Sequence, residues 1–505
     1  MTGTPTILVE IDQASRDAFS QLLTVRYLRR RGARVLIANQ HTFIGMCERY
    51  RPAVVYATWL TGGPLMSYLI QYARRGQVAL IDQEGGRIGE APFKRSFTRL
   101  KGIRAEVGKV CAKVFSWGNT QAGWLRELGF VPADRIVVTG SPRFDPYLVL
   151  QERLATRHLG VTLRGDALTS LPNRLMEHVF FYAQADERDG VSVGYPLGAQ
   201  FEDKVWHVVA TTRCLFKTAK AFSQSSQARI VFRPGPWEQV QQYRFLSQTI
   251  ASASVNASTP QHEYVRNAFA LLEESSSMGL EGLVSRVPVI SVHALIPGLK
   301  AHLSGEGGGL FSALYLPFYW KPKSVEEAVE MILEAERGRL AATPDPEGAQ
   351  EYLQEHHGWP RRRPSSFEIG DRLLELLRTQ PSAERGSVQP EPVDRMAHLK
   401  RAVYRHVPGS VHALKATLLC RQAMSPERAL WFRYHYSDVF YPHHQTVRAI
   451  FDSLWRMHGM APRPEPAPMP VAEEDHAYSP NGPSPVDAEG RDAQSSVARS
   501  TQGGI

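Results

Sequence analysis

The sequence predicts an α/β protein in which two domains are each built on a parallel β-sheet with helices on its faces. Short apolar, β-branched runs alternate along the chain with segments of helical periodicity, which is typical of βαβ units. Segments that begin at residues 115 and 269 each join such a run to a turn rich in Gly or Ser. Open parallel sheets bind ligands at turns of this kind, so the two segments predict two halves that face each other across a cleft.

The first half is predicted to begin with a strand over residues 7–11 and a helix over 15–31. Apolar residues from Phe19 to Tyr27 recur at helical spacing, and Gly32 ends the helix. The remaining predicted elements of this half are strands over 35–38, 54–56, 78–81 and 137–139 and a helix over 64–75.

The second half begins after an irregular, linker-like stretch over 150–175. Ser324 is expected to cap a helix, because Glu327 follows three residues later in a capping-box pattern. The other predicted elements are strands over 179–182, 229–232, 268–272 and 289–292 and helices over 203–222, 237–249 and 277–285.

These elements predict an N-terminal domain over 1–165 and a C-terminal domain over 176–345. Residues 346–460 are predicted to form a helical, basic extension, since 395–460 contain ten Lys or Arg and only three acids. Residues 461–505 contain eight prolines and few apolar side chains, so we expect a disordered tail.

Composition narrows the function classes. The formal charge of +9 suits anionic partners such as nucleotides, nucleic acid or the inner face of a membrane. The four cysteines lie far apart, which argues for a reducing compartment and against a structural zinc site. No signal peptide and no apolar run of membrane-spanning length is recognised, so a cytoplasmic protein is expected. No zinc-type His spacing, Walker loop or GxGxxG after a strand is found, so no metal and no cofactor is predicted.

Candidate binding residues of the second half lie where two predicted strands end. Arg233 ends one strand, and Ser275, Ser276 and Ser277 lead into a helix that contains Glu281. A helix N-terminus favours phosphate, an Arg can hold a diphosphate through its planar fork, and a carboxylate can accept hydrogen bonds from ribose hydroxyls. The alternative is that the serines only cap the helix and that the charged side chains lie on the surface.

Candidate catalytic residues of the first half are Asp82 and Glu84, at a strand end beside a glycine pair that allows close approach of a substrate. Either carboxylate could act as general base on an acceptor hydroxyl, and the alternative is that both are turn residues.

Two further pairs in this half are candidates for substrate contacts. Glu10 ends the first strand and Arg16 begins the next helix, where they could also form a structural ion pair. Arg143 and Asp145 follow the last strand, and the favoured interpretation is that they pair with each other and cap the interdomain turn.

Together these residues resemble the bacterial surface-carbohydrate biosynthesis proteins, which have the GT-B glycosyltransferase architecture of two Rossmann-like domains. The resemblance covers residues 5–340, and its most specific part is Thr-Gly-Ser-Pro-Arg-Phe-Asp at 139–145. The second half is similar to the donor domain of GT-B enzymes and of UDP-N-acetylglucosamine 2-epimerases. Other carriers of the resemblance are Val9-Glu10 with Arg16, Asp82-Gln-Glu-Gly85, Ser116-Trp-Gly118, Arg233-Pro-Gly-Pro236 and the segment 275–281.

The resemblance implies a glycosyltransferase of surface polysaccharide biosynthesis, which transfers a sugar from a nucleotide-sugar donor to a glycan or lipid-linked acceptor. The donor phosphates would lie at the serines and Arg233, the ribose at Glu281, and the acceptor near Glu10, Arg16 and Glu84. A sugar-nucleotide epimerase is the alternative enzyme. Relatives often have His at the position of Gly235, and this departure favours a third alternative, a non-catalytic assembly protein.

The basic extension over 395–460 predicts attachment to the anionic inner leaflet of a membrane, because basic and aromatic side chains both suit that interface. The alternative is a helical cap packed on the donor domain. No nucleic-acid partner is expected, because no recognised binding module accompanies the charge.

Overall fold

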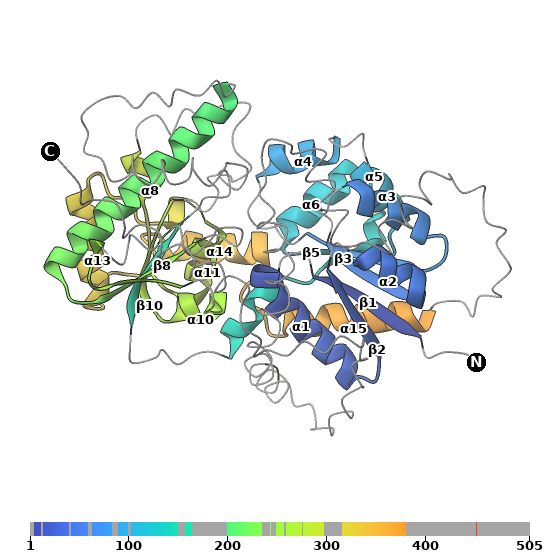
Figure 1. Ribbon diagram of the computed structural model, residues 1–505. Helices are drawn as coiled ribbons and strands as arrows, with labels where there is room; N and C mark the ends of the chain where they lie inside the picture. The colour runs from blue at the N-terminus through green and yellow to red at the C-terminus, as the bar shows by residue number, and fades with distance from the viewer. Residues whose placement is uncertain are drawn as a thin grey trace, which may run out of the picture. The chain divides into compact units, whose positions relative to one another are not determined.

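The computed structural model is an α/β structure with two parallel sheets (Figure 1). Among the residues that it describes, no helix is long and apolar enough to cross a membrane. The described residues are 5–11, 14–39, 42–58, 63–82, 89–98, 103–149, 157–163, 199–234, 243, 249–256, 259–274, 276–296, 316–379 and 451.

The first sheet has six strands in the order β2-β1-β3-β4-β5-β6, and each neighbouring pair is parallel. Because β2 and β3 lie on opposite sides of β1, the winding of the chain reverses there. Parallel sheets bind ligands outside the carboxyl ends of the strands at such a switch point. The strands are β1 (Thr6–Ile11), β2 (Arg34–Asn39), β3 (Val54–Thr58), β4 (Gln77–Ile81), β5 (Lys113–Ser116) and β6 (Ile136–Val138).

Both faces of the first sheet are buried, as expected of parallel strands. In β1, Leu8 belongs to one apolar cluster, while Ile7 and Val9 belong to another. The Leu8 cluster includes side chains of α2 (Phe43–Tyr50), α3 (Gly63–Tyr72), α4 (Glu90–Thr98), α5 (Ile103–Val110) and α6 (Asn119–Leu128).

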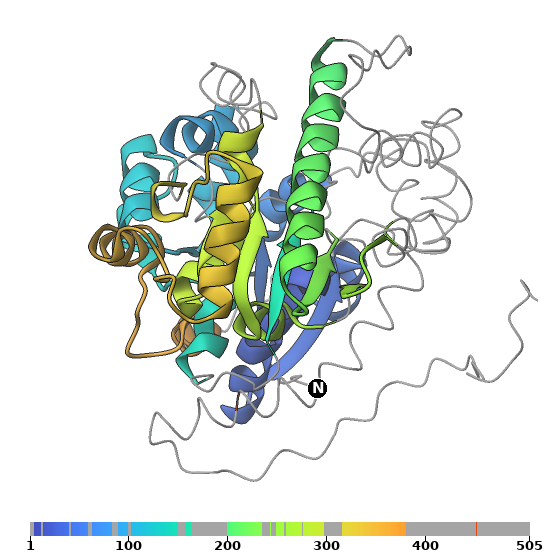
Figure 2. The same ribbon diagram turned by 90° about the vertical axis from the view of Figure 1, so that its left-hand side faces the viewer.

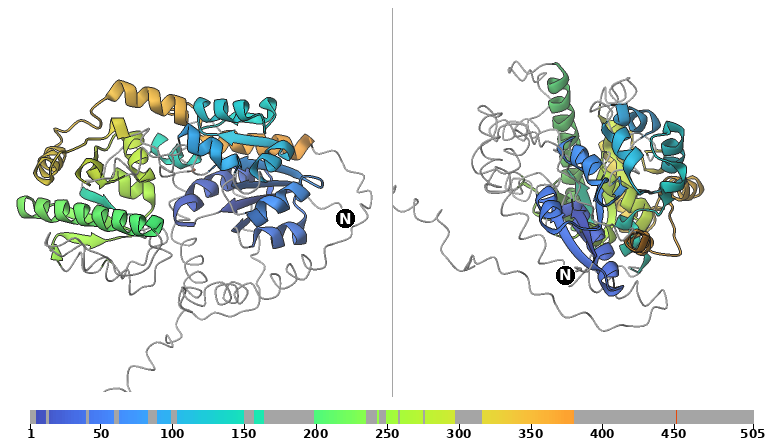
Figure 3. Two further views of the ribbon diagram at one scale, coloured as in Figure 1. Left: turned by 90° about the horizontal axis from the view of Figure 1, so that it is seen from above. Right: turned by 90° about the vertical axis from the view of Figure 1, so that its right-hand side faces the viewer.

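The face that holds Ile7 and Val9 is covered by α1 (Ala14–Arg30) together with α15 (Ser365–Thr379), which comes from far along the chain (Figure 3). The Tyr27 ring stacks on Phe367 with centroids 4.6 Å apart, and its hydroxyl donates a hydrogen bond to Asp371 at 2.5 Å. A Cβ at Gly370 would lie 2.4 Å from the Tyr27 ring, so this glycine permits the close approach of the two helices. The buried Phe451 also packs on Phe367, with ring centroids 5.6 Å apart.

The second sheet has five strands in the order β11-β10-β7-β8-β9, again all parallel. Its switch point lies at β7, between β10 and β8. Helices α8 (Ala199–Ser225) and α13 (Val325–Glu336) lie side by side on this unit (Figure 2). The strands are β7 (His158–Thr162), β8 (Arg229–Arg233), β9 (Ala253–Val255), β10 (Ala268–Glu273) and β11 (Val289–Ser291).

Strand β7 corrects one expectation from the sequence. It lies inside the expected linker over 150–175, yet it is the central strand of the second sheet. Gly160 sits in the middle of β7, and a Cβ there would meet Leu271 at 2.7 Å and Tyr264 at 3.0 Å. The glycine is needed for close packing, whereas glycine in a short run usually indicates a turn.

The expected cap of α13 is confirmed in part. The Ser324 hydroxyl accepts a hydrogen bond from the Glu327 amide at 3.1 Å. In a capping box the Glu327 carboxylate would accept from the amide of Ser324. Here it accepts from the Lys323 amide at 2.6 Å, one residue earlier in the chain.

The other predicted strands and helices that fall on described residues are present with small shifts of their ends. The strand over 179–182, nearly all of the helix over 237–249, and the tail over 461–505 lie outside the described residues. Of the predicted extension over 346–460, the described residues are 346–379, which contain α14 (Pro346–His357) and α15, and Phe451.

Candidate functional site

The carboxyl ends of β7, β8 and β10 bring polar side chains together at the switch point of the second sheet. Thr162, Arg233 and Glu273 are the last residues of these strands, and all three are buried. Helix α11 (Ser277–Ser285) begins directly after β10 and carries Glu281. Arg233 and the described part of the segment 275–281 therefore lie at the same edge of the second sheet.

The N-terminus of α11 is occupied by groups of the protein itself. The Ser276 hydroxyl caps the helix by accepting a hydrogen bond from the Met278 amide at 3.2 Å. The Glu273 carboxylate accepts from the Ser276 amide, so a negative charge already lies at this helix end. Ser277 is the first helical residue, and Ser275 lies outside the described residues.

Glu281 is the acceptor of a buried ion pair. Its Oε1 lies 2.8 Å from Arg143 Nη2, and each side chain is only 4% exposed. The Tyr147 hydroxyl donates to Oε2 at 2.6 Å, and the Gln261 amide donates to Oε1 at 2.8 Å. Three donors thus hold one carboxylate, two of them from η3 (Pro142–Leu148), which follows the first sheet.

This arrangement raises the pKa of Tyr147 well above its ordinary value, first through burial and then through the nearby Glu281 charge. The sequence-based pairing of Arg143 with Asp145 is wrong, because Arg143 pairs with Glu281 instead.

Arg233 lies next to this group, buried to 6% exposure. Its Nη1 donates to the Thr259 carbonyl at 2.7 Å, and its guanidinium lies 5.2 Å from the centre of the Tyr264 ring. Burial lowers the pKa of Arg233, and the Tyr264 and Glu281 side chains oppose that effect. We call Arg143, Tyr147, Arg233, Gln261 and Glu281 the Glu281 cluster.

Asp145 has a structural role. Its two carboxylate oxygens each accept a backbone hydrogen bond at 2.7 Å, from Ser365 and from Ser366. These amides belong to the first turn of α15, so Asp145 anchors that helix N-terminus on η3. Complete burial raises the pKa of Asp145 to about 6, although the hydrogen bonds from Ser366 and Ser365 act in the opposite direction.

The first sheet places its two described candidate carboxylates at strand ends. Glu10 is buried near the end of β1 and accepts from the Thr58 amide at 2.8 Å across the switch point. Asp82 follows β4 and accepts from the Gln121 side chain at 3.3 Å. Arg16 belongs to α1, its side chain is not among those described, and Glu84 lies outside the described residues.

Sequence reasoning did not single out Glu273 and Glu274 as site residues, although both are buried at the carboxyl end of β10. The Glu274 carboxylate lies 3.5 Å from His293 Nδ1. Two acids that directly end the apolar run of β10 were the available signal, because buried carboxylates in that position require partners. Across the described part of the chain, no group of three or more His, Cys, Asp or Glu side chains could hold a metal ion.

Comparison with known proteins gives similar solved structures only. No protein-family model matches the chain, and no curated protein matches it significantly. A protein assigned as a UDP-N-acetylglucosamine 2-epimerase from Listeria monocytogenes is similar with a TM-score of 0.43 and 11% identity, covering 74% of this chain and 96% of that one. The UDP-N-acetylglucosamine 2-epimerase of Methanocaldococcus jannaschii has a TM-score of 0.39 and 10% identity, covering 70% and 99%. The wall teichoic acid polymerase TagF has a TM-score of 0.46 and 11% identity, covering 75% and 90%.

Proposed function

We propose that the chain is a GT-B-like glycosyltransferase of surface polysaccharide biosynthesis, which uses a nucleotide-sugar donor and a glycan or lipid-linked acceptor. The observation that carries the proposal is the switch point of the second sheet. There β7, β8 and β10 end beside a Ser-capped helix, with a buried arginine and a buried glutamate close by. The start of the helix and the arginine fork suit phosphates, and the glutamate suits ribose hydroxyls.

Glu281 is proposed to accept hydrogen bonds from the donor ribose, and Arg233 with the serines over 275–277 to hold the diphosphate. Since Arg143, Tyr147 and Gln261 occupy the Glu281 carboxylate, the nucleotide must displace at least one of these donors. Binding of the donor would therefore loosen the contact between η3 and α11. Arg143 and Asp145 serve the structure in this scheme, which leaves Glu10 and Arg16 as the proposed acceptor contacts.

Glu84 is proposed as general base on the acceptor hydroxyl, with Asp82 as the second candidate. A general base contributes about 10²–10⁴-fold to turnover, so Glu84→Gln should lower turnover and leave donor affinity nearly unchanged. Retained turnover in both Glu84→Gln and Asp82→Asn would place the base elsewhere.

The proposal is tested by measuring thermal stabilisation with a panel of CMP-, CDP-, GDP- and UDP-sugars. A ligand at about 100 times its dissociation constant stabilises the folded state by about 2.7 kcal/mol. Glu281→Gln should weaken binding of the active sugar nucleotide by about 1–3 kcal/mol, because a charged hydrogen-bond acceptor is lost. Glu351→Gln, an exposed change on α14 (Pro346–His357), is the matched control. Unchanged affinity in Glu281→Gln and Arg233→Gln would remove the donor site.

A non-catalytic assembly protein is the second candidate function. The observation that favours it is that protein groups already occupy the binding groups of α11, Glu281 and Arg233. Absence of nucleotide-sugar binding and of nucleotide release across the whole panel would support this candidate over the transferase.

Membrane attachment through 395–460 is part of the transferase proposal. The full chain should sediment with anionic vesicles and not with neutral ones. Added salt should release it, because salt screens the attraction between exposed charges. A chain truncated after residue 394 that still sediments would contradict this attachment.

A further inference from the structure

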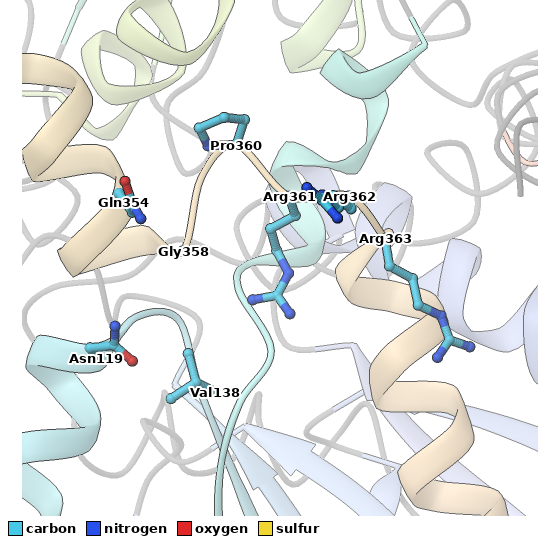
Figure 4. Close-up of a pocket in the computed structure, with 8 residues that line it drawn as sticks. All are labelled: Asn119, Val138, Gln354, Gly358, Pro360, Arg361, Arg362 and Arg363. Carbon is cyan, nitrogen blue, oxygen red and sulfur yellow. The ribbon is translucent and has the colours of Figure 1, made fainter.

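A pocket of about 410 Å³ opens beside the first sheet, and none of the residues assigned to donor or acceptor is among those that line it (Figure 4). Three consecutive arginines line it, Arg361, Arg362 and Arg363, from the segment that joins α14 to α15. On the other side lie Asn119, the first residue of α6, and Val138, the last residue of β6. All of the described residues that line this pocket are neutral or basic.

Two of the three arginine charges are matched by acids on α15. Arg361 pairs with Glu368, and Arg363 pairs with Asp371. Arg362 is exposed, and within the described part of the chain it has no hydrogen-bond or ion-pair partner. Among the described residues, the pocket therefore carries one positive charge, that of Arg362, without a matching acid.

Two glycines leave room for the Arg361 side chain, which its ion pair with Glu368 holds in place. Gly140 has φ +74°, and a Cβ there would lie 2.6 Å from Arg361 Cδ. Gly358 has φ +58°, and a Cβ there would lie 3.0 Å from Arg361 Nη1. The Arg361 stem thus lies against Gly140 and its guanidinium against Gly358, and the guanidinium extends toward Asn119 and Val138 (Figure 4). A fixed guanidinium loses little freedom when it binds an anion.

The start of α6 adds to the same field. Its N-cap, Gly118, supplies no side-chain hydrogen bond, and its first turn contains no acid. No capping carboxylate therefore faces the positive end of this helix dipole, and the groups that lie against Gly118 are the Glu355 and His356 carbonyl oxygens at the end of α14.

We propose that this pocket binds a phosphate-bearing anion, with Arg362 as its main cation and Arg361 and Asn119 as fixed partners. Phosphate fits better than a single carboxylate, because its several oxygens can accept from two guanidinium groups at once. The volume lies in the range of pockets for small ligands. The anion could be a small phosphate compound or one segment of a phosphate-bearing polymer.

Isothermal titration calorimetry on the full chain tests this, with inorganic diphosphate and long-chain polyphosphate as probes and sodium chloride to match ionic strength. A polymer ligand would bind more tightly as the chain lengthens beyond the pocket, whereas a small ligand would gain nothing. Arg362→Gln should weaken diphosphate binding at least ~10-fold, and Arg362→Lys should retain part of the affinity because it keeps the charge without the fork. Arg378→Gln, an exposed change at the far end of α15, should leave binding unchanged.

The design separates this pocket from the proposed donor site. Ser276→Ala at the start of α11 should leave diphosphate binding intact. Binding that Ser276→Ala abolishes and Arg362→Gln spares would overturn the proposal, as would equal binding in Arg362→Gln and the parent chain or no heat with either probe. A circular-dichroism melt of each variant confirms folding. If Arg362→Gln melts at a lower temperature than the parent chain, the test uses the diphosphate affinity of Arg362→Lys relative to that of the parent chain.

Discussion

The buried pair of Arg143 and Glu281 should dominate the stability of the contact between η3 and α11. Arg143→Met removes the cation and leaves the Glu281 carboxylate buried, with Tyr147 and Gln261 as its remaining donors among the described residues. Glu281→Gln leaves the Arg143 guanidinium buried without its anion. Each change leaves one charged side chain buried, at 4% exposure, where water cannot replace the lost partner.

Breaking a buried pair by removing one partner lowers the free energy of unfolding by about 3–5 kcal/mol. The 2.8 Å contact and the two further donors to Glu281 place this pair in that range. The double variant Arg143→Met/Glu281→Gln removes both charges, so we expect its loss to fall short of the sum by about 2–3 kcal/mol, as in contacting pairs.

The double-mutant cycle is measured by urea unfolding of the parent chain, the two single variants and the double variant, followed by circular dichroism. The exposed pair of Arg337 and Glu334 is the matched control, since its side chains are 52% and 39% exposed. Arg337→Met should change the free energy of unfolding by less than about 1 kcal/mol. A loss below about 1 kcal/mol in Arg143→Met, or strict additivity in the double variant, would refute a buried, interacting pair.

Three further outcomes follow from the contacts. Burial raises the pKa of Asp145 from its ordinary 3.8 to about 6 in the folded state, so the folded chain binds the extra proton and the free energy of unfolding should fall as pH rises from about 4 to 6. Asp145→Asn should remove that slope in urea titrations at several pH values. Gly118→Ala should lower the melting temperature, because its Cβ would lie 2.3 Å from the Glu355 carbonyl oxygen; Gly123→Ala in the same helix has open space and should stabilise by about 0.5–1 kcal/mol, and the reverse order would contradict the packing. His357 is fully buried with neither ring nitrogen hydrogen-bonded within the described structure, so His357→Leu should leave calorimetric stability unchanged or higher at pH 7, and a loss above about 2 kcal/mol would contradict this.

Local sequence patterns were sufficient to predict most strands of the two sheets. The apolar runs of β1, β3, β4 and β10 are buried on both faces, and such runs are visible in the sequence without knowledge of their neighbours. Strand β7 was not visible, because Gly160 makes a short strand look like a turn while its function is to admit Leu271 and Tyr264. That requirement appears only when the neighbouring strand and helix are in place.

The partners of the site residues could not be predicted for a similar reason. Glu281 and Arg143 are 138 residues apart, and the Asp145 contacts to Ser365 and Ser366 span 220 and 221 residues. The sequence indicated that Arg143, Asp145 and Glu281 lie at strand-to-helix turns, where charged side chains need partners. Which charges meet is decided by how distant turns pack, and local spacing contains no information on that.

Helix α15 covers a face of the first sheet, and its apolar residues Phe367 and Leu373 share a cluster with Ile7 and Val9. The last strand of that sheet, β6, ends at Val138, whereas α15 ends at Thr379. At synthesis rates of about 5–20 residues per second, roughly 10–50 s pass between the two. On the ribosome, this face of the first sheet is therefore covered by α1 without α15 during that interval, so part of its apolar surface stays exposed until α15 is made.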